Sequence, residues 1–359
     1  MTDMDRNIKV GVVGAGWWAT SAHIPGILEH NNAVLYSVQN RSREKADRIA
    51  KDFGAGFAFD DYRKLIAMEE LDAVVVSSTP NVHFEQAKFA LQLEKHVLIE
   101  KPMTFTAAQA RELCELAASK KRQLLVSCPW HFTRHGKEAR NLIKASALGE
   151  IRMITILMTN PVDKLLKGIN TSPTHGLNEA YIEPNPGSYS NPEIAGGGQI
   201  YTQVSHAGAY LSFLTATRPD EVYARFDFDG TDTDIYNVLT ISMRNGPIVN
   251  LSSTGATPLN VRQYEVRVFG TRGILLLELW KGHMTFHSFD EKKIVYTPLT
   301  ESEIYPEKAP VSNFIDAILG AKENGSPGVY GLAAMEIIEA ACLSNSNRRS
   351  IKISELSRH

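Results

Sequence analysis

The chain of 359 residues is long enough for two domains of common size. A formal net charge of -2 and 43% hydrophobic residues exclude the strongly basic classes that bind nucleic acid or membrane surfaces through charge, so we expect neither partner. No apolar run approaches the ~18 residues of a membrane span, the N-terminus is too polar for a signal peptide, and three scattered cysteines favour a cytoplasmic protein.

Strands and helices alternate along the first third of the chain. Short apolar runs predict buried strands at Ile8–Val13, Ala33–Val38, Ala73–Ser77, His96–Ile99 and Gln123–Ser127. Helical spacing predicts helices that include Arg43–Phe53, Phe84–Leu93 and Ala107–Ser119. This order is typical of a parallel sheet with right-handed crossovers, and it predicts an α/β domain over residues 1–127.

The character of the sequence changes after Ser127. A helix at Arg134–Ser146 and a strand at Ile151–Thr159 precede Asn160–Ala195, which is dense in Pro, Gly, Asn and Ser. So long an irregular stretch is usually functional, and we interpret it as a loop that covers the substrate. Several β-rich runs between Glu221 and Tyr296 then predict a large, mostly antiparallel open sheet.

Two helical patterns, Val311–Lys322 and Tyr330–Asn345, close the chain. The apolar stripe of the second predicts that it packs back near the domain junction. We therefore assign residues 128–359 to an α+β domain that binds substrate and forms oligomers.

A glycine-rich turn directly follows the first strand. It reads Gly14-Ala15-Gly16-Trp17-Trp18-Ala19 and opens a helix, as the dinucleotide-binding fingerprint does. Glycine permits the tight turn and the close approach of backbone amides to a pyrophosphate, which then lies on a helix N-terminus. The sequence predicts a Rossmann domain that binds NAD or NADP; the alternative is a plain strand-to-helix turn.

The end of the second strand decides between the two dinucleotides. An acid usually binds the ribose 2′-hydroxyl of NAD about 20 residues after the fingerprint. Here Asn40 and Arg41 occupy that place, and the first acid is Glu44. Asn40 is uncharged and does not repel a 2′-phosphate, and the guanidinium of Arg41 can pair with one, so the sequence modestly favours NADP. The alternative is that Arg41 is a solvated surface charge.

Two more motifs follow later strands, at the sheet edge where open α/β sheets bind ligands. The first is Thr79-Pro80-Asn81 with His83, and the second is Glu100-Lys101-Pro102. Together with the fingerprint and the GGGQ segment at Gly196–Gln199, they make the chain resemble the Gfo/Idh/MocA family of glucose–fructose oxidoreductase and inositol dehydrogenase. The resemblance covers nearly the whole chain.

The resemblance implies a catalytic lysine and histidine. Lys101 corresponds to the lysine beside the nicotinamide and the substrate hydroxyl, where an ammonium with a lowered pKa can assist proton transfer. His206 corresponds to the family's histidine, while Thr202 stands where an aspartate is usual and cannot serve as a base. The two are four positions apart, so on one helix they share a face. The alternatives are a surface lysine in a turn and a structural histidine.

Other residues are weaker candidates for substrate contacts. Trp130 and His131 follow the fifth strand, and Tyr181 lies in the long loop. His131 and His135 are four residues apart, but no HExxH motif accompanies them, so we expect no metal.

The resemblance implies hydride transfer between a secondary alcohol of a sugar, cyclitol or related polyol and NAD(P). Two alternatives stay open: an NAD-dependent glycosidase of the same fold, and a sensor that binds dinucleotide without chemistry. The family also implies pairing through the exposed face of the second sheet, so we expect a homodimer or homotetramer.

Overall fold

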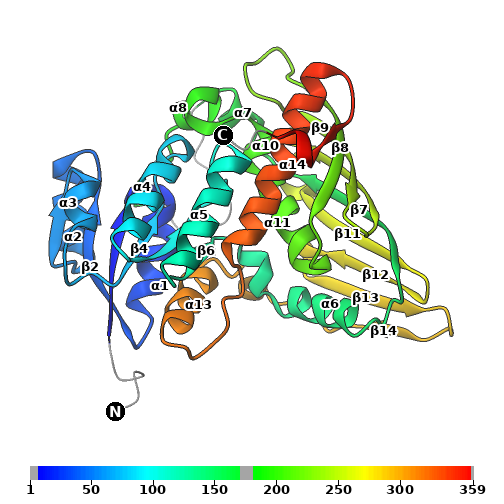
Figure 1. The fold of residues 1–359 in the computed structure, drawn as a ribbon, viewed down its shortest axis with the longest axis horizontal. Helices are drawn as coiled ribbons and strands as arrows, with labels where there is room; N and C mark the ends of the chain where they lie inside the picture. The colour runs from blue at the N-terminus through cyan, green and yellow to red at the C-terminus, as the bar shows by residue number, and fades with distance from the viewer. Residues whose placement is uncertain (1–6, 170–180, 357–359) are drawn as a thin grey trace.

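The computed structural model describes residues 7–169 and 181–356 and contains two sheets (Figure 1). The first is fully parallel, in the order β3-β2-β1-β4-β5-β6. Its strands are β1 (Ile8–Val13), β2 (Ala33–Gln39), β3 (Phe57–Phe59), β4 (Ala73–Val76), β5 (His96–Ile99) and β6 (Leu124–Val126). The predicted parallel sheet is confirmed. β3 was missed because three residues are too short for a recognisable pattern.

Helices cover both faces of this sheet, and β4 shows why. Its four residues are all buried; Val74 and Val76 pack in one apolar cluster, while Val75 packs in another on the opposite face. Strands buried on both faces are continuous apolar runs rather than alternating ones. The covering helices are α1 (Ile24–Leu28), α2 (Arg43–Phe53), α3 (Tyr62–Ile66), α4 (Pro80–Gln92), α5 (Ala107–Ser119) and α13 (Ala309–Ile318).

The second sheet has nine strands in the order β14-β13-β12-β11-β7-β10-β9-β8-β15. Only β7 and β10 run parallel among its pairs in the described chain. The strands are β7 (Ile151–Thr159), β8 (Pro219–Asp227), β9 (Tyr236–Met243), β10 (Ile248–Thr254), β11 (Gln263–Gly270), β12 (Gly273–Glu278), β13 (His283–Ser288), β14 (Lys293–Val295) and β15 (Ile351–Lys352). This confirms the predicted, mostly antiparallel sheet.

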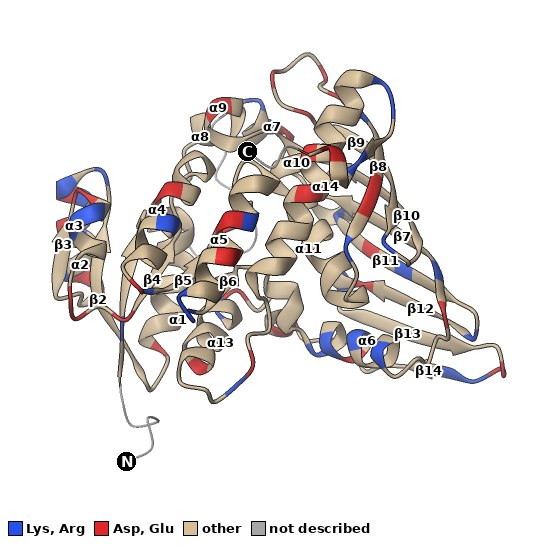
Figure 2. Cartoon of the chain, in the orientation of Figure 1, with Lys and Arg blue, Asp and Glu red and all other residues tan. Residues whose placement is uncertain are grey.

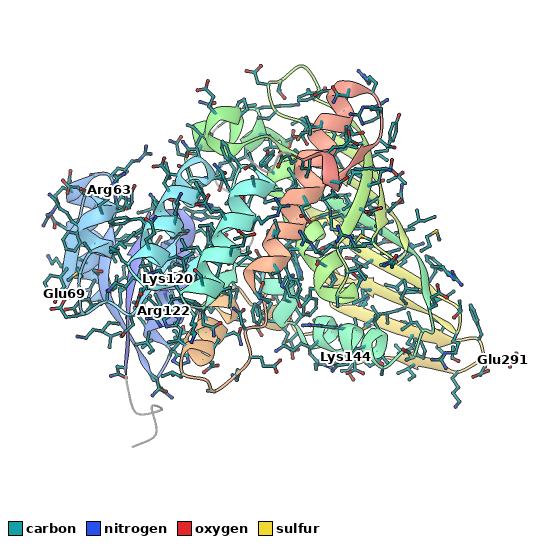
Figure 3. The ribbon with its side chains drawn as sticks, viewed as in Figure 1. Arg63, Glu69, Lys120, Arg122, Lys144 and Glu291 are labelled. Atoms are coloured by element: carbon teal, nitrogen blue, oxygen red, sulfur yellow. The ribbon has the colours of Figure 1, made fainter. Side chains whose placement is uncertain are left out.

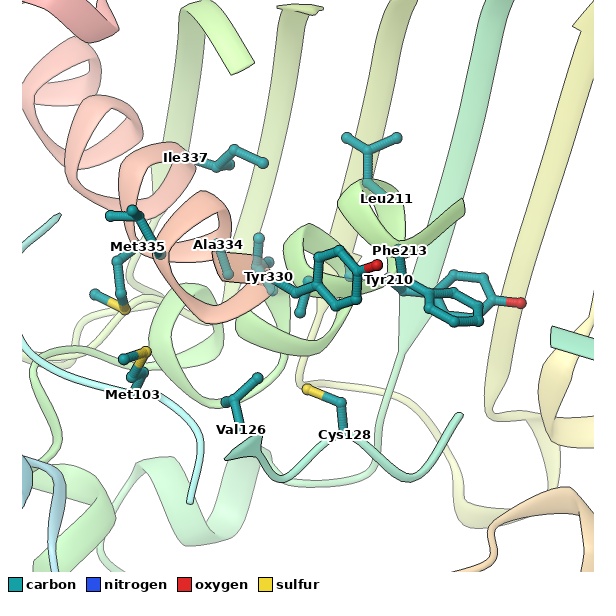
Figure 4. Packing of buried hydrophobic residues seen from close by; sticks show 14 of the residues in the cluster. Met103, Val126, Cys128, Tyr210, Leu211, Phe213, Tyr330, Ala334, Met335 and Ile337 are labelled. Carbon is teal, nitrogen blue, oxygen red and sulfur yellow. The ribbon is translucent and has the colours of Figure 1, made fainter. Parts of the chain in front are cut away.

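Two long helices lie between the sheets: α11 (Val204–Thr215) and α14 (Gly328–Asn347) (Figure 1). Figure 4 shows Tyr210 and Phe213 of α11 beside Tyr330 and Ala334 of α14. The helices touch closely at Gly208, where a Cβ atom would lie 3.0 Å from the Cα of Ala334. α14 also packs against α5 of the first sheet's helical layer. The division of the chain at residues 127 and 128 remains a prediction.

Shorter helices connect these layers. They are α6 (Arg134–Lys144), α7 (Asp163–Leu166), α8 (Gly187–Ser190), α9 (Pro192–Ala195), α10 (Gln199–Thr202) and α12 (Glu301–Ile304). Three of them, α7 to α9, lie within the segment that we interpret as a substrate-covering loop, of which residues 170–180 are outside the description.

Residues of both charge signs are distributed over the helices, strands and turns of the chain (Figure 2). Labelled examples extend from Arg63 and Glu69 at the edge of the parallel sheet to Glu291 in the turn between β13 and β14 (Figure 3). None of the described helices is long and apolar enough to cross a membrane.

Candidate active site

A cleft of about 2170 Å³ runs from the carboxyl ends of the parallel strands to the second sheet. Its walls include the residues after β1, β2, β4 and β5, the 182–189 segment, the end of α10, and α12 with the segment that follows it. The cleft therefore lies where open α/β sheets bind ligands. Of the predicted site residues, the cleft is lined by Gly14, Gly16, Trp17, Trp18, Asn40, Arg41, Thr79, Pro80, Asn81, His83, Glu100, Lys101, Trp130, Thr202 and His206.

The glycine-rich turn has the geometry that a pyrophosphate needs. Gly14 has a φ of +73°, and a Cβ atom there would lie 2.5 Å from the backbone of Ser78, so only glycine fits. Its N–H donates to Oε1 of Gln39 at 3.0 Å, which fixes the turn against the end of β2. A Cβ atom on Gly16 would meet nothing closer than 3.8 Å. The residues present thus fit a dinucleotide, with open space over Gly16.

The ribose end of the cleft contains both signs of charge. Asn40 donates from Nδ2 to the carbonyl of Ala15 at 2.8 Å, so its amide connects β2 to the glycine-rich turn. Arg41 and Lys45 line this end, as do Asp60 and Asp61, which precede α3. Lys45 was overlooked because a lysine in a charged helix carries no special signal. The two aspartates were overlooked together with β3.

The Thr79–Asn81 motif forms the start of α4. Pro80 is its first residue, where a missing N–H has no cost, and the Oγ1 of Thr79 donates to Oδ1 of Asn81 at 2.7 Å. His83 is buried, with Nδ1 2.9 Å from the carbonyl of Pro102 and Nε2 3.0 Å from that of Ser78. Its ring lines the cleft, yet both nitrogens are engaged by backbone, so His83 positions the two strand ends.

Glu100 is buried beneath the cleft. Its Oε1 lies 2.8 Å from Nε2 of His23, and its Oε2 accepts from the backbone N–H of Lys101 at 3.1 Å. Burial alone raises the pKa of Glu100, but the hydrogen bond from His23 and the charge of Lys101 hold it below its ordinary value. An ionised Glu100 supplies the negative charge next to Lys101.

Lys101 extends from the end of β5 to the second domain. Its Nζ donates to the backbone carbonyl of Thr202 at 3.1 Å. Burial lowers the pKa of Lys101 below its ordinary value of 10.5, although the charge of Glu100 opposes that change. A partly buried lysine with a lowered pKa that lines a cleft can exchange a proton with a bound hydroxyl.

Thr202 and His206 do not share one continuous helix, contrary to the sequence interpretation. The chain breaks at Gln203 (φ −118°), which separates α10 from α11. The Oγ1 of Thr202 bonds back to the carbonyl of Gly198 at 2.9 Å, so the position presents its carbonyl, rather than its side chain, to Lys101. The hydroxyl is already committed within the helix.

His206 lines the cleft and is almost entirely buried. Burial, reinforced by the charge of Lys101, lowers its pKa well below the ordinary 6.5. Its Nδ1 is enclosed with no partner in the described chain, which leaves Nε2 as the nitrogen for a ligand. A neutral imidazole suits a hydrogen bond to a substrate hydroxyl.

Asp234, which was not predicted from the sequence, fixes the start of α10. This buried carboxylate accepts from the backbone N–H of Gly198 at 2.9 Å and of Ile200 at 2.7 Å, and from Nδ2 of Asn237 at 2.9 Å. It thus caps the helix whose last residue contacts Lys101. Asp234 is one of four aspartates between residues 227 and 234, so no pattern could distinguish it from Asp227, Asp229 and Asp232.

Aromatic rings form one wall of the cleft, and Trp18 of the glycine-rich turn packs beside them, with its ring centroid 6.2 Å from that of Tyr305. Trp130 contacts His206, with ring centroids 5.0 Å apart, as well as Trp280 at 5.0 Å and Tyr305 at 4.7 Å. These rings can exclude water and support the apolar face of a sugar. Trp280 and Tyr305 lie far along the chain from Trp130, and no local motif indicated them.

Two candidates for substrate contacts lie elsewhere. His131 is buried, stacks on Phe213 with centroids 4.6 Å apart, and has Nδ1 2.8 Å from Oγ of Ser326; it does not line the cleft. His131 therefore packs in the core after β6 and does not make the predicted substrate contact. Tyr181 donates to Asp52 of α2 at 2.6 Å and packs on Phe53, so it fastens the long loop to the first domain.

Within residues 7–169 and 181–356, no group of three His, Cys, Asp or Glu side chains is arranged to hold a metal ion. His135 lies instead against the carbonyl of Thr297, with Nε2 3.1 Å away.

Comparison with known proteins gives matches over most of the chain. A model described as an oxidoreductase family with an NAD-binding Rossmann fold matches residues 8–128, and a GFO/IDH/MocA C-terminal domain model matches residues 137–276. An uncharacterised oxidoreductase of Synechocystis sp. is 28% identical over 208 residues, which are 58% of this chain and 51% of that protein. The chain thus matches about half the length of this relative.

Two further proteins are similar over longer stretches. The D-glucoside 3-dehydrogenase of Escherichia coli (strain K12) is 25% identical over 277 residues, or 72% of this chain and 73% of that protein. The structure of aldose-aldose oxidoreductase from Caulobacter crescentus, complexed with glycerol, has a TM-score of 0.77 and 21% identity, and the match covers 97% of this chain and 100% of that one. The second likeness concerns the fold.

Proposed function

The chain belongs to the Gfo/Idh/MocA oxidoreductase family, and from that premise we propose that it transfers hydride between a secondary alcohol of a sugar, cyclitol or related polyol and NAD(P). The observation that carries the proposal is Lys101, partly buried at the end of β5, with its Nζ bonded to the carbonyl of Thr202 of α10. The similarity to a glucoside dehydrogenase supports a sugar-like substrate.

The dinucleotide has a place for each of its parts. The turn at Gly14–Gly16 would hold the pyrophosphate, and Asn40 with Arg41 would lie at the adenosine ribose. When bound, the nicotinamide supplies the hydride acceptor or donor. We infer that both dinucleotides bind, with a modest preference for NADP, because two cations lie at the ribose end. Asp60 and Asp61 oppose that preference and keep it small.

Lys101 and His206 perform the proton chemistry in this proposal. During oxidation the unprotonated Nζ of Lys101 accepts the proton of the substrate hydroxyl, and during reduction the ammonium returns it. His206 holds the same hydroxyl through Nε2. Glu100 keeps a negative charge beside the lysine, and the carbonyl of Thr202 orients the Nζ. Trp130 and Tyr305 keep water away.

A screen of sugars and inositols for the absorbance of reduced nicotinamide tests the proposal. A dehydrogenase reduces one equivalent of cofactor for each alcohol oxidised. An NAD-dependent glycosidase cleaves a glycoside without net change of cofactor, and a sensor binds dinucleotide without turnover. Either of those results would replace the proposed activity, and the intact Lys101 with His206 argues against the sensor.

A further inference from the structure

Arg262 is a cation in the cleft that the proposed chemistry does not use. It follows the short helical turn Leu259–Val261 and directly precedes β11. Its guanidinium lies 3.9 Å from the ring centroid of Trp280, and both residues line the cleft. Stacking on an indole fixes the plane of the guanidinium and leaves its N–H groups directed outward from the edge.

The charge of Arg262 has no counter-charge. In the described parts of the chain, no carboxylate lies within 4.0 Å of it and no acceptor takes a hydrogen bond from its five N–H donors. Burial alone lowers its pKa, and no neighbouring acid restores it. By contrast, Arg111 and Arg218 both pair with the buried Glu336. An unpaired, half-buried arginine is a costly feature unless a ligand completes it.

The position of Arg262 relates it to the reacting groups. Trp280, on which it stacks, contacts Trp130 at 5.0 Å, and Trp130 contacts His206 at 5.0 Å. Three successive contacts of 5.0, 5.0 and 3.9 Å thus connect His206 with Arg262. A substituted sugar whose hydroxyl lies beside His206 can reach the guanidinium along these rings.

We propose that Arg262 binds an oxyanion on the substrate, a carboxylate or a phosphate, so that the enzyme prefers an acidic sugar over its neutral counterpart. The inference rests on the proposed function and narrows its substrate class. A guanidinium fork matches both oxyanions with two parallel hydrogen bonds, which a neutral hydroxymethyl group cannot supply.

Calorimetry on the protein saturated with reduced dinucleotide tests this without turnover, because an alcohol and a reduced nicotinamide do not react. The probes are the methyl glycosides of glucose, glucuronate and glucose 6-phosphate, which have no free aldehyde to be reduced, with the corresponding galactose and mannose series. Arg262→Met is compared with Arg262→Lys and with Arg267→Met, a matched control on β11 that lies outside the cleft and pairs with Glu265.

We expect at least one anionic sugar to bind wild-type protein at least tenfold more tightly than its neutral partner. Arg262→Met should weaken that anion by about 10–100-fold, the effect of losing hydrogen bonds to a charged group, and neutral sugars much less. Arg262→Lys should retain part of the preference, and Arg267→Met all of it. Whether glucuronate or glucose 6-phosphate responds identifies the oxyanion.

Two results would overturn the inference: neutral sugars that bind as tightly as the anionic ones, or an Arg262→Met protein that loses all of them equally. Absence of binding by every probe counts against it as well. Turnover of neutral sugars without an anion preference would support the proposed dehydrogenase and refute the oxyanion site at Arg262. Arg262-dependent binding of an anionic sugar without any nicotinamide-linked turnover would support the oxyanion site and refute the dehydrogenase.

Discussion

Lys101 is the residue on which the proposed chemistry depends most. Replacement by methionine keeps the length and the apolar stem but removes the group that exchanges the proton. We expect turnover to fall by ~10²–10⁴-fold, the usual effect of losing a positioned general acid–base group, while the dissociation constant for dinucleotide changes little. Steady-state kinetics with fluorescence titration of the cofactor measures both. Full turnover by a folded Lys101→Met protein would contradict the proposed role.

The lowered pKa of Lys101 gives the oxidation reaction a definite pH dependence. Only the unprotonated Nζ accepts the hydroxyl proton, so kcat/KM for oxidation should rise with pH and level off above the pKa of the free enzyme. Because burial lowers that pKa, the midpoint should lie below the ordinary 10.5 of lysine. Since His206 is neutral down to well below pH 6.5, we expect no second titration near that value. A kcat/KM for oxidation that does not rise with pH anywhere below 10.5 would oppose the assignment.

Asn40 governs the choice of dinucleotide in our proposal. Asn40→Asp places a carboxylate at the ribose end of the cleft, where it repels a 2′-phosphate and accepts from a 2′-hydroxyl. We expect the ratio of NADP to NAD affinity to fall by on the order of tenfold, which corresponds to about 1.4 kcal/mol. Parallel calorimetric titrations of wild type and variant give the ratio. Clearly tighter binding of NAD by the wild type would show that the interpretation of Arg41 is wrong.

At the scale of elements, α10 links the second domain to Lys101. Asp234→Ala removes the carboxylate that accepts from Gly198 and Ile200, so α10 loses its cap and the carbonyl of Thr202 loses its position. We expect a loss of about 1–2 kcal/mol in the free energy of unfolding and a drop in kcat. Ser42→Ala is the matched control, because it removes the side-chain cap of α2, which has no contact with α10, and Ser42 does not line the cleft. The control should lower the free energy of unfolding by a similar amount but leave kcat unchanged. Equal kcat in both variants would refute the linkage.

The same element shows where sequence reasoning ends. The fingerprint and the EKP motif could be identified because each is local: a strand, a turn and a helix that adjoin along the chain. The break at Gln203 could not, because spacing alone cannot distinguish one helix from two. The contact of Asp234 with Gly198 and that of Arg262 with Trp280 could not be identified either, because only the folded chain brings these residues together. β3 was missed for its length.

At the scale of the whole molecule, α14 joins what the sequence divides into two domains. Its buried Glu336 pairs with Arg111 of α5 and with Arg218, which precedes β8. The predicted helical pattern at Tyr330–Asn345 indicated the element, yet no pattern in one chain could indicate an ion pair among three distant segments. This bridge lies behind the cleft and holds the sheet of Lys101 against the layer of His206.

The outer face of the nine-stranded sheet supports a last prediction, that the protein forms a homodimer or homotetramer. α11 and α14 cover one face, whereas the other leaves Val238 of β9 51% exposed and Ile248 of β10 61% exposed, with Met153 of β7 paired beside Ile248. A specific interface buries about 800 Å² on each partner, and a broad sheet face can supply that area.

We expect light scattering to give at least twice the monomer mass. Val238→Lys combined with Ile248→Lys should shift the protein toward monomer, because unpaired charges would then be buried at the contact. Leu28→Lys, at an equally exposed leucine on α1, should not. A wild-type protein that remains monomeric at micromolar concentration would disprove association through this face.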